Sequence, residues 1–205
     1  MKGEVISLSI GEPDFVTPWR IREAGIYSLE QGYTHYSPNQ GYIQVRRAIS
    51  KYMNRRFNLD YDSDSQILIS VGGSEALDLA ARALINPGDE VIIFEPCFVS
   101  YKATILMAKG VPVVIPTYEE DGFKLTASAL EKAITHKTKY ILLGYPCNPT
   151  GAVMSKNDLS ALVQVLKKYP DILVLSDELY GELNYSGEEP ISIASFPEMY
   201  ERTIM

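Results

Sequence analysis

Short apolar runs alternate with amphipathic segments along the chain, and the two patterns predict strands and helices in turn. The apolar runs are rich in Val, Ile and Leu with few polar positions, which is typical of strands buried on both faces of a helix-covered parallel sheet. The predicted strands are residues 66–71, 90–94, 111–115, 139–143 and 172–176, and residues 202–205 resemble the opening of another.

The predicted helices are bounded by residues that favour helix ends. Thr17-Pro18 favours a start and Gly32 a stop, so a first helix is expected between them. Ser155 and Asp158 come close to a capping box and open the last helix. The helices in order cover residues 18–31, 41–57, 74–85, 126–135 and 155–169. The β-α-β-α order predicts an α/β fold with a doubly wound, mainly parallel sheet.

Composition and charge narrow the class of function. With 205 residues the chain holds one domain or slightly more, and 46% hydrophobic residues are enough for a core. The formal charge is −7, from 19 basic and 26 acidic residues, which argues against a nucleic-acid surface. A small anionic ligand stays open, because a nest of backbone amides binds phosphate even in an acidic protein.

Cysteine and histidine usage argues against a metal site or a disulfide framework. Two cysteines, Cys97 and Cys147, lie far apart in the sequence, and His35 and His136 are the two histidines. Apolar runs are too short to span a bilayer, and the first residues lack the pattern of a secretory signal. We therefore expect a cytoplasmic location without membrane attachment.

The first predicted strand is followed by Gly72-Gly73-Ser74-Glu75, which opens a helix and suits a phosphate. Two glycines allow close backbone approach, and free N–H groups lie at the helix start. A plain strand-to-helix turn with Ser74 as the cap explains these residues equally well. A third interpretation is the nucleophile elbow of a hydrolase, which needs a histidine later in the chain, and His136 is the candidate.

The other strand ends carry an aromatic ring, an amide and a carboxylate with a phenol. Taken singly, Phe98 fits a core position, Asn148-Pro149-Thr150-Gly151 a turn, and Asp177 in Asp177-Glu178-Leu179-Tyr180 a helix cap. A carboxylate at the end of an apolar strand is costly unless it is paired or hydrogen-bonded. In open parallel sheets ligands bind at the carboxyl ends of the strands, so these side chains are expected to meet.

Together and in this order, these residues resemble the class I/II aminotransferases of the fold-type I enzymes that use pyridoxal 5′-phosphate (PLP). The resemblance covers almost the whole chain. It rests on residues 9–15, 33–38 with Gly41, 72–77, 87–91, 148–151 and 176–180. It implies a three-layer α/β/α cofactor domain, expected at residues 34–205, after an arm and first helix at residues 1–33.

The resemblance also implies a role for each matching residue. Gly73, Ser74 and Glu75 would hold the PLP phosphate, Glu75 through its backbone. The remaining roles are stacking on the pyridine ring for Phe98, the 3′ oxygen for Asn148 and Tyr180, the ring nitrogen for Asp177, the neighbouring subunit's phosphate for Tyr36, and the substrate carboxylate for the backbone of Gly11. The role of Tyr36 implies a homodimer with shared active sites.

One element that the resemblance requires is missing. None of the 11 lysines matches the Schiff-base lysine, which belongs to a segment after residue 205. We therefore expect a cofactor-domain fragment that is inactive alone and has an incomplete sheet, whose exposed edge would pair with another copy.

The expected reaction is transfer of an amino group between an amino acid and a 2-oxo acid, with the amino acid undetermined. The same motifs would serve a cystathionine β-lyase-like or aminocyclopropane-carboxylate-synthase-like enzyme, or a PLP-binding sensor domain without catalysis.

Overall fold

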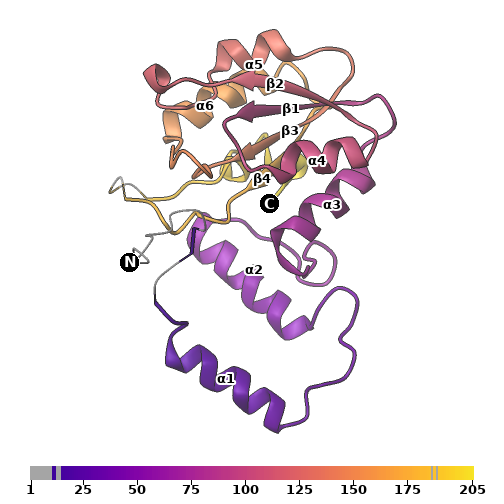
Figure 1. Ribbon diagram of the computed structural model, residues 1–205, viewed down its shortest axis with the longest axis vertical. Helices are drawn as coiled ribbons and strands as arrows, with labels where there is room; N and C mark the ends of the chain where they lie inside the picture. Colours follow the sequence, from indigo (N-terminus) through magenta and orange to yellow (C-terminus); the bar gives the residue numbers. More distant parts are fainter. Residues whose placement is uncertain (1–10, 13–14, 186, 188) are drawn as a thin grey trace, which may run out of the picture. The chain divides into compact units, whose positions relative to one another are not determined.

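The computed structural model describes residues 11–12, 15–185, 187 and 189–205, which form two compact units. The smaller unit ends at Asn39 and contains helix α1 (Trp19–Glu30). The larger unit begins at Gln40 and holds every other helix and strand (Figure 1). Each unit is described by itself.

A parallel five-stranded sheet forms the centre of the larger unit, in the order β2-β1-β3-β4-β5. Its strands are β1 (Glu90–Glu95), β2 (Val111–Pro116), β3 (Thr138–Gly144), β4 (Leu173–Asp177) and β5 (Thr203–Ile204). The helices of this unit are α2 (Ile43–Phe57), α3 (Gly72–Leu84), α4 (Ser100–Met107), α5 (Ala127–Ala133) and α6 (Lys156–Leu166). The predicted α/β fold with a parallel sheet is confirmed.

Side chains that alternate along each strand build a separate core on each face of the sheet. Ile92, Ile141 and Val174 pack with residues of α5 and α6, whereas their neighbours Val91 and Tyr140 pack with residues of α3 and α4. Successive strand residues point to opposite faces, so a run with no polar position fills both cores. Figure 1 shows α5 and α6 over one face and α3 and α4 over the other, which gives three layers.

Helix ends explain much of the local structure. The capping box at α6 is confirmed: the Ser155 hydroxyl accepts from the Asp158 N–H at 3.2 Å, and the Asp158 carboxylate accepts from the Ser155 N–H at 2.9 Å. At α1 the helix starts one residue later than expected, with Pro18 rather than Thr17 at the cap. Gly32 follows the helix with φ of 79°, as a stop signal should.

One predicted strand does not form, and one helix was not predicted. Residues 66–71 are not a strand, because within the described residues no strand lies beside them to complete a ladder. Two backbone N–H groups of this stretch find acceptors elsewhere: the Gln66 N–H donates to the Asp62 carbonyl at 2.9 Å, and the Ile69 N–H donates to the Gln40 carbonyl at 3.1 Å. Helix α4 was not predicted, because its apolar and polar residues do not separate into two faces along the sequence.

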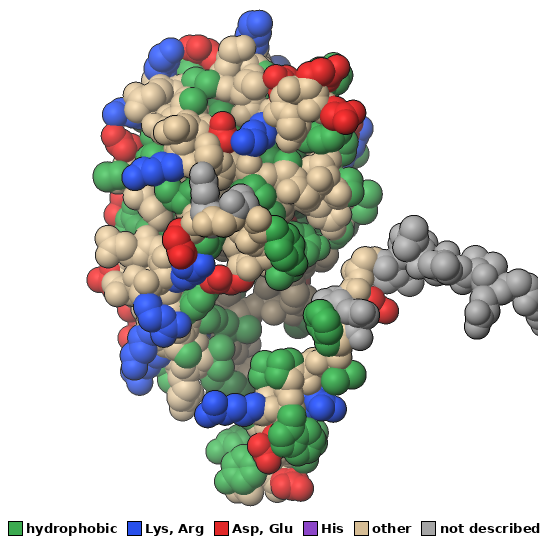
Figure 2. All heavy atoms as spheres, turned by 90° about the vertical axis from the view of Figure 1, so that its left-hand side faces the viewer, with side chains coloured by type: hydrophobic (Ala, Val, Ile, Leu, Met, Phe, Trp, Pro, Cys, Tyr) green, Lys and Arg blue, Asp and Glu red, His purple; other side chains and the backbone are tan. Residues whose placement is uncertain are grey.

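The surface of the larger unit carries charges of both signs. On the face shown in Figure 2, acidic and basic side chains of this unit are interspersed. Among the helices of the described residues, none has both the length and the apolar character that a membrane span needs.

Candidate active site

A pocket lies where the carboxyl ends of the strands meet the start of α3, and it gathers six of the predicted site residues. Gly73 and Ser74 come from α3, Phe98 precedes α4, Asn148 follows β3, and Asp177 and Tyr180 end or follow β4. The remaining lining residues are Leu77, Tyr101, Pro146 and Leu179. The topology brings these residues together, because parallel strands end on the same edge of the sheet.

One side of the pocket is formed by the first turn of α3. The helix begins at Gly72, whose φ of 79° suits glycine, and its capping residue Val71 offers no side-chain hydrogen bond. The first N–H groups of a helix have no acceptor within the helix and carry its positive dipole end. Because the helix starts two residues earlier than predicted, Ser74 lies in the first turn and is not the cap.

Glu75 contributes to this turn without lining the pocket. Its carboxylate turns back and accepts the Val71 N–H. The side chain thus satisfies one donor of the helix start, and the acidic group at the amino end favours the dipole. The backbone contact to a phosphate that the resemblance implies for Glu75 stays a prediction.

Asp177 is the carboxylate of the pocket, and neighbouring donors hold both of its oxygens. Oδ1 accepts the Leu179 N–H at 3.2 Å, and Oδ2 accepts the Tyr101 hydroxyl at 2.8 Å. Those bonds compensate for placing a charged group at the end of a buried strand. The interpretation of Asp177 as a helix cap does not apply, because none of the described residues that follow it begins an α-helix.

The amide of Asn148 and the phenol of Tyr180 form a second polar pair. The Asn148 Nδ2 lies 3.5 Å from the Tyr180 hydroxyl, a long hydrogen bond that leaves both groups able to contact one ligand oxygen. Since Asn148 follows β3 and Tyr180 follows β4, the pair spans two neighbouring strands.

Tyr101 is a site residue that the sequence reasoning missed. It is 4% exposed, lines the pocket from α4, and packs edge-to-face on Phe98 with ring centroids 5.8 Å apart. Burial and then the charge of Asp177 raise the pKa of Tyr101 far above its usual range. The signal in the sequence is weak, since a tyrosine three positions after Phe98 looks like any core residue.

Glu178, the residue after Asp177, belongs to a separate hydrogen-bonded cluster. Its carboxylate accepts the hydroxyls of Ser176 at 2.8 Å and Ser192 at 2.6 Å. Burial raises the pKa of Glu178 to about 7, against the lowering effect of the two serine hydrogen bonds. The group lies in a separate pocket with Phe57 and Met154, and nothing in its local sequence pattern predicts this burial.

Two predicted residues belong to the smaller unit. Tyr36 is fully exposed and Gly11 is also exposed. Of the motif near the start, Ser9, Ile10, Pro13 and Asp14 lie outside the described residues. The roles expected for Tyr36 at the neighbouring subunit's phosphate and for Gly11 at the substrate carboxylate stay predictions.

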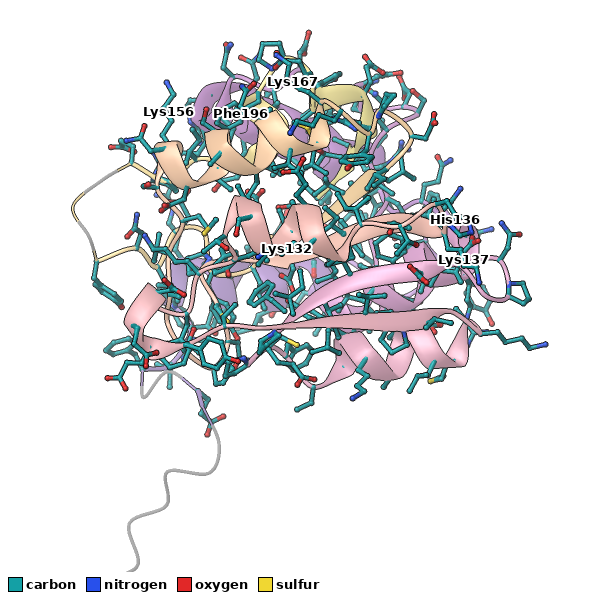
Figure 3. All side chains as sticks on the ribbon, turned by 90° about the horizontal axis from the view of Figure 1, so that it is seen from above. Lys132, His136, Lys137, Lys156, Lys167 and Phe196 are labelled. Atoms are coloured by element: carbon teal, nitrogen blue, oxygen red, sulfur yellow. The ribbon has the colours of Figure 1, made fainter. Side chains whose placement is uncertain are left out.

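The described residues that line the pocket include neither a lysine nor a histidine. Lys132 lies in α5, Lys156 begins α6 and Lys167 follows the end of α6, on the opposite face of the sheet from α3 and α4 (Figure 3). His136 lies beside Lys137 where β3 begins, so it is at the wrong end of the sheet to activate Ser74. The hydrolase interpretation is therefore discarded.

Comparison with known proteins agrees with this geometry. The family model described as aminotransferase class I and II matches residues 3–205. The chain belongs to that family. It is 53% identical over 201 residues to the Bacillus subtilis protein YugH, whose name places it with the aminotransferases, and 42% identical to an aspartate aminotransferase of Pyrococcus abyssi.

Solved structures of this family share the fold. An aromatic aminotransferase from Pyrococcus horikoshii superimposes with a TM-score of 0.93 at 41% identity, over 97% of this chain and 53% of that one. Each of the two matches with curated relatives includes 98% of this chain. The chain spans only about half the length of those relatives, 52% of YugH and 51% of the Pyrococcus abyssi enzyme.

Aminotransferases of this family use PLP, and the donor set of the pocket fits that cofactor. Free helix N–H groups suit its phosphate, and the carboxylate of Asp177 suits a protonated ring nitrogen. Phe98 offers a ring for stacking, and the Asn148–Tyr180 pair offers donors to a phenolic oxygen. Among the described residues, no group of His, Cys, Asp and Glu side chains is arranged to hold a metal ion.

Proposed function

We propose that this chain forms the cofactor-binding part of a PLP-dependent aminotransferase, which transfers an amino group between an amino acid and a 2-oxo acid. One observation carries the proposal: an anion-binding helix start, a carboxylate and an amide–phenol pair line a single pocket at the strand ends. The family of the chain supports it, and the aminotransferase names of its relatives favour this reaction over a lyase or a sensor domain.

The proposed roles follow from the chemistry of each group. The backbone N–H groups of Gly73, Ser74 and Glu75, with the Ser74 hydroxyl, bind the phosphate, which anchors the ring. Phe98 holds the plane of the ring and excludes water from one face. When bound, PLP supplies an electron sink.

The remaining groups adjust the charge distribution of the cofactor ring. Asp177 keeps a proton on the ring nitrogen, because a carboxylate close to a base favours its protonated form. Asn148 and Tyr180 bind the 3′ oxygen, and their 3.5 Å separation lets one oxygen contact both. A covalent link to PLP would require a lysine amine, and no lysine lines the described pocket, so we propose that this chain alone does not transaminate.

The homodimer is part of the same proposal. Within the smaller unit, helix α1 has no buried residue, although it carries Trp19, Ile26 and Tyr27, and hydrophobic side chains of this unit are visible in Figure 2. Apolar side chains left exposed on a helix fit an interface with a second copy. We propose that Tyr36 contributes to the phosphate site of that copy and Gly11 to the substrate carboxylate.

Three further assignments are proposals of the same kind. Residues 34–205 are taken as the cofactor domain and residues 1–33 as the arm and first helix. A cytoplasmic location is proposed because Cys97 and Cys147 are free thiols, as expected in a reducing compartment. The partners proposed are amino and 2-oxo acids, without nucleic acid or membrane.

Titration of the 205-residue chain with PLP, followed by circular dichroism of the cofactor band, tests the proposal. We expect saturable binding that is at least tenfold weaker in Asp177→Ala, roughly the effect of removing one charge-assisted contact. Asp171→Ala removes an exposed carboxylate on a turn before β4 and should bind like the wild type. Borohydride reduction should leave no cofactor mass on the protein. Binding that ignores Asp177 would overturn the assignment of the pocket.

The reaction is tested by joining the chain to the C-terminal half of the Bacillus subtilis relative. An aminotransferase converts an amino acid to its 2-oxo acid and leaves the amino group on the cofactor. A lyase releases ammonia and pyruvate instead, and this outcome would contradict the proposed reaction while keeping the cofactor site.

A further inference from the structure

Tyr101 connects the carboxylate and the aromatic ring of the candidate site. From its buried position on α4, its hydroxyl donates to Asp177 Oδ2 at 2.8 Å. Its ring meets Phe98 edge-on, with an interplanar angle of 80°. A single side chain thus contacts two groups that are proposed to hold the cofactor ring.

Gly144 makes the space that the Tyr101 hydroxyl occupies. Gly144 and Asp177 are paired in register at the ends of β3 and β4. A Cβ added at Gly144 would lie 2.2 Å from the Tyr101 hydroxyl oxygen and 3.1 Å from its Cζ. Any larger residue at position 144 would therefore displace the phenol from Asp177.

The direction of the hydrogen bond follows from burial. The phenol of Tyr101 keeps its proton, because burial and the nearby Asp177 charge both disfavour the phenolate. Tyr101 therefore donates to Oδ2, while the Leu179 N–H holds Oδ1. Each carboxylate oxygen has two acceptor positions, so one remains open on each for a ligand.

We propose, on the basis of the function proposed above, that Tyr101 is a positioning residue that fixes the carboxylate of Asp177 toward the N–H of a protonated nitrogen heterocycle. Two donors, one on each oxygen, define the rotation of the carboxylate about its χ2 bond. Without the phenol, Oδ2 loses its partner and the group turns away to find another. Tyr101 acts through Asp177 and touches no reacting atom.

The test compares PLP with its 1-deaza analogue, in which a C–H replaces the ring nitrogen. Both ligands are titrated into the wild-type chain, Tyr101→Phe and Tyr140→Phe, and the ratio of dissociation constants is measured. Tyr140 is a matched control, because it is a buried phenol of the same core on β3. We expect Tyr101→Phe to reduce the preference for PLP about tenfold, as for a lost hydrogen bond to a charged group, and Tyr140→Phe to keep it.

A second measurement needs no cofactor. Urea unfolding of the wild type, Tyr101→Phe, Asp177→Ala and the double variant forms a mutant cycle. Because Tyr101 and Asp177 share a hydrogen bond, Tyr101→Phe should lower the urea midpoint by less when residue 177 is already alanine. If the shifts in urea midpoint of the two single variants add up to that of the double variant, the hydrogen bond between Tyr101 and Asp177 is contradicted.

The two proposals fail in different ways. If the wild type binds neither ligand saturably, the proposed function is overturned, and with it the role of Tyr101 toward a cofactor. If the wild type prefers PLP and Tyr101→Phe retains or increases that preference, the cofactor site stands and only the positioning role is overturned.

Discussion

Glu178 and Ser192 lie 14 positions apart in the sequence, and the Ser192 hydroxyl donates to the Glu178 carboxylate at 2.6 Å. Ser192 is completely buried, so its hydroxyl cannot hydrogen-bond to water and donates to the Glu178 carboxylate instead. The pair makes a prediction about the pH dependence of stability.

Glu178→Gln should remove part of that pH dependence. The pKa of Glu178 rises from an ordinary 4.5 to about 7 on folding, so the folded state holds a proton that the unfolded state has lost. Its contribution to stability is complete below pH 4.5 and is lost as the pH rises through 7. The wild type should lose up to roughly 3 kcal/mol of unfolding free energy across this window, and the glutamine variant should lack this part of the slope.

Ser192→Ala gives an independent check on the same group. It removes a donor that stabilises the charged form, so the pKa of Glu178 should rise further and the loss should extend to higher pH. Urea unfolding at a series of pH values measures both variants. Equal slopes in wild type and Glu178→Gln would contradict the assignment.

Ser74→Asp should separate the phosphate from the ring of the cofactor. A carboxylate in the first turn of α3 places a negative charge beside the proposed phosphate position, and such repulsion should cost roughly tenfold or more in PLP affinity. Pyridoxal, which lacks the phosphate, should bind as to the wild type. Ser74→Ala removes the hydroxyl without adding charge and should show a smaller loss. Equal losses for both ligands would place the phosphate elsewhere.

Gly72→Ala should destabilise the larger unit by about 1 kcal/mol, because alanine is strained at positive φ. The space around Gly72 is open, so the strain of its φ of 79° is isolated from any clash. Gly73 is the matched control: it also has open surroundings but no positive φ, and Gly73→Ala should cost nothing. Thermal unfolding of the two variants measures the difference. Equal stabilities would show that the start of α3 tolerates alanine at both positions.

Ser155→Ala should cost about 1 kcal/mol of unfolding free energy, since it breaks the capping box of α6. Ser160→Ala, within the same helix, removes a hydroxyl without touching the cap and should be neutral or slightly stabilising. A larger effect at position 160 than at 155 would contradict the role of the cap.

The sequence pattern was informative where a structure depends on local residues. Runs such as residues 91–94 are apolar on both faces, and their strands were predicted within one or two residues. The site could be anticipated because parallel topology alone brings Asn148 and Asp177 to one edge of the sheet. The capping box at Ser155 lies within four residues and was equally visible.

Features that depend on distant partners were not visible. Residues 66–71 have the composition of a strand, but a ladder needs a neighbour that no local pattern reports. The role of Tyr101 depends on Asp177, 76 positions away, and the burial of Glu178 depends on Ser192. In each of these cases the physical cause is a contact between segments that are distant in the sequence, and the local pattern of residues does not reveal which segments meet.

The close approach of Tyr101 to Gly144 has a consequence for sequence divergence. Because a side chain at position 144 would occupy the place of the tyrosine hydroxyl, residue 144 cannot gain bulk while the tyrosine keeps its position. Relatives that keep both the aspartate at position 177 and the tyrosine at position 101 should therefore also keep glycine at position 144. A lineage that gains bulk at the first position must find another donor for the aspartate in the same evolutionary step.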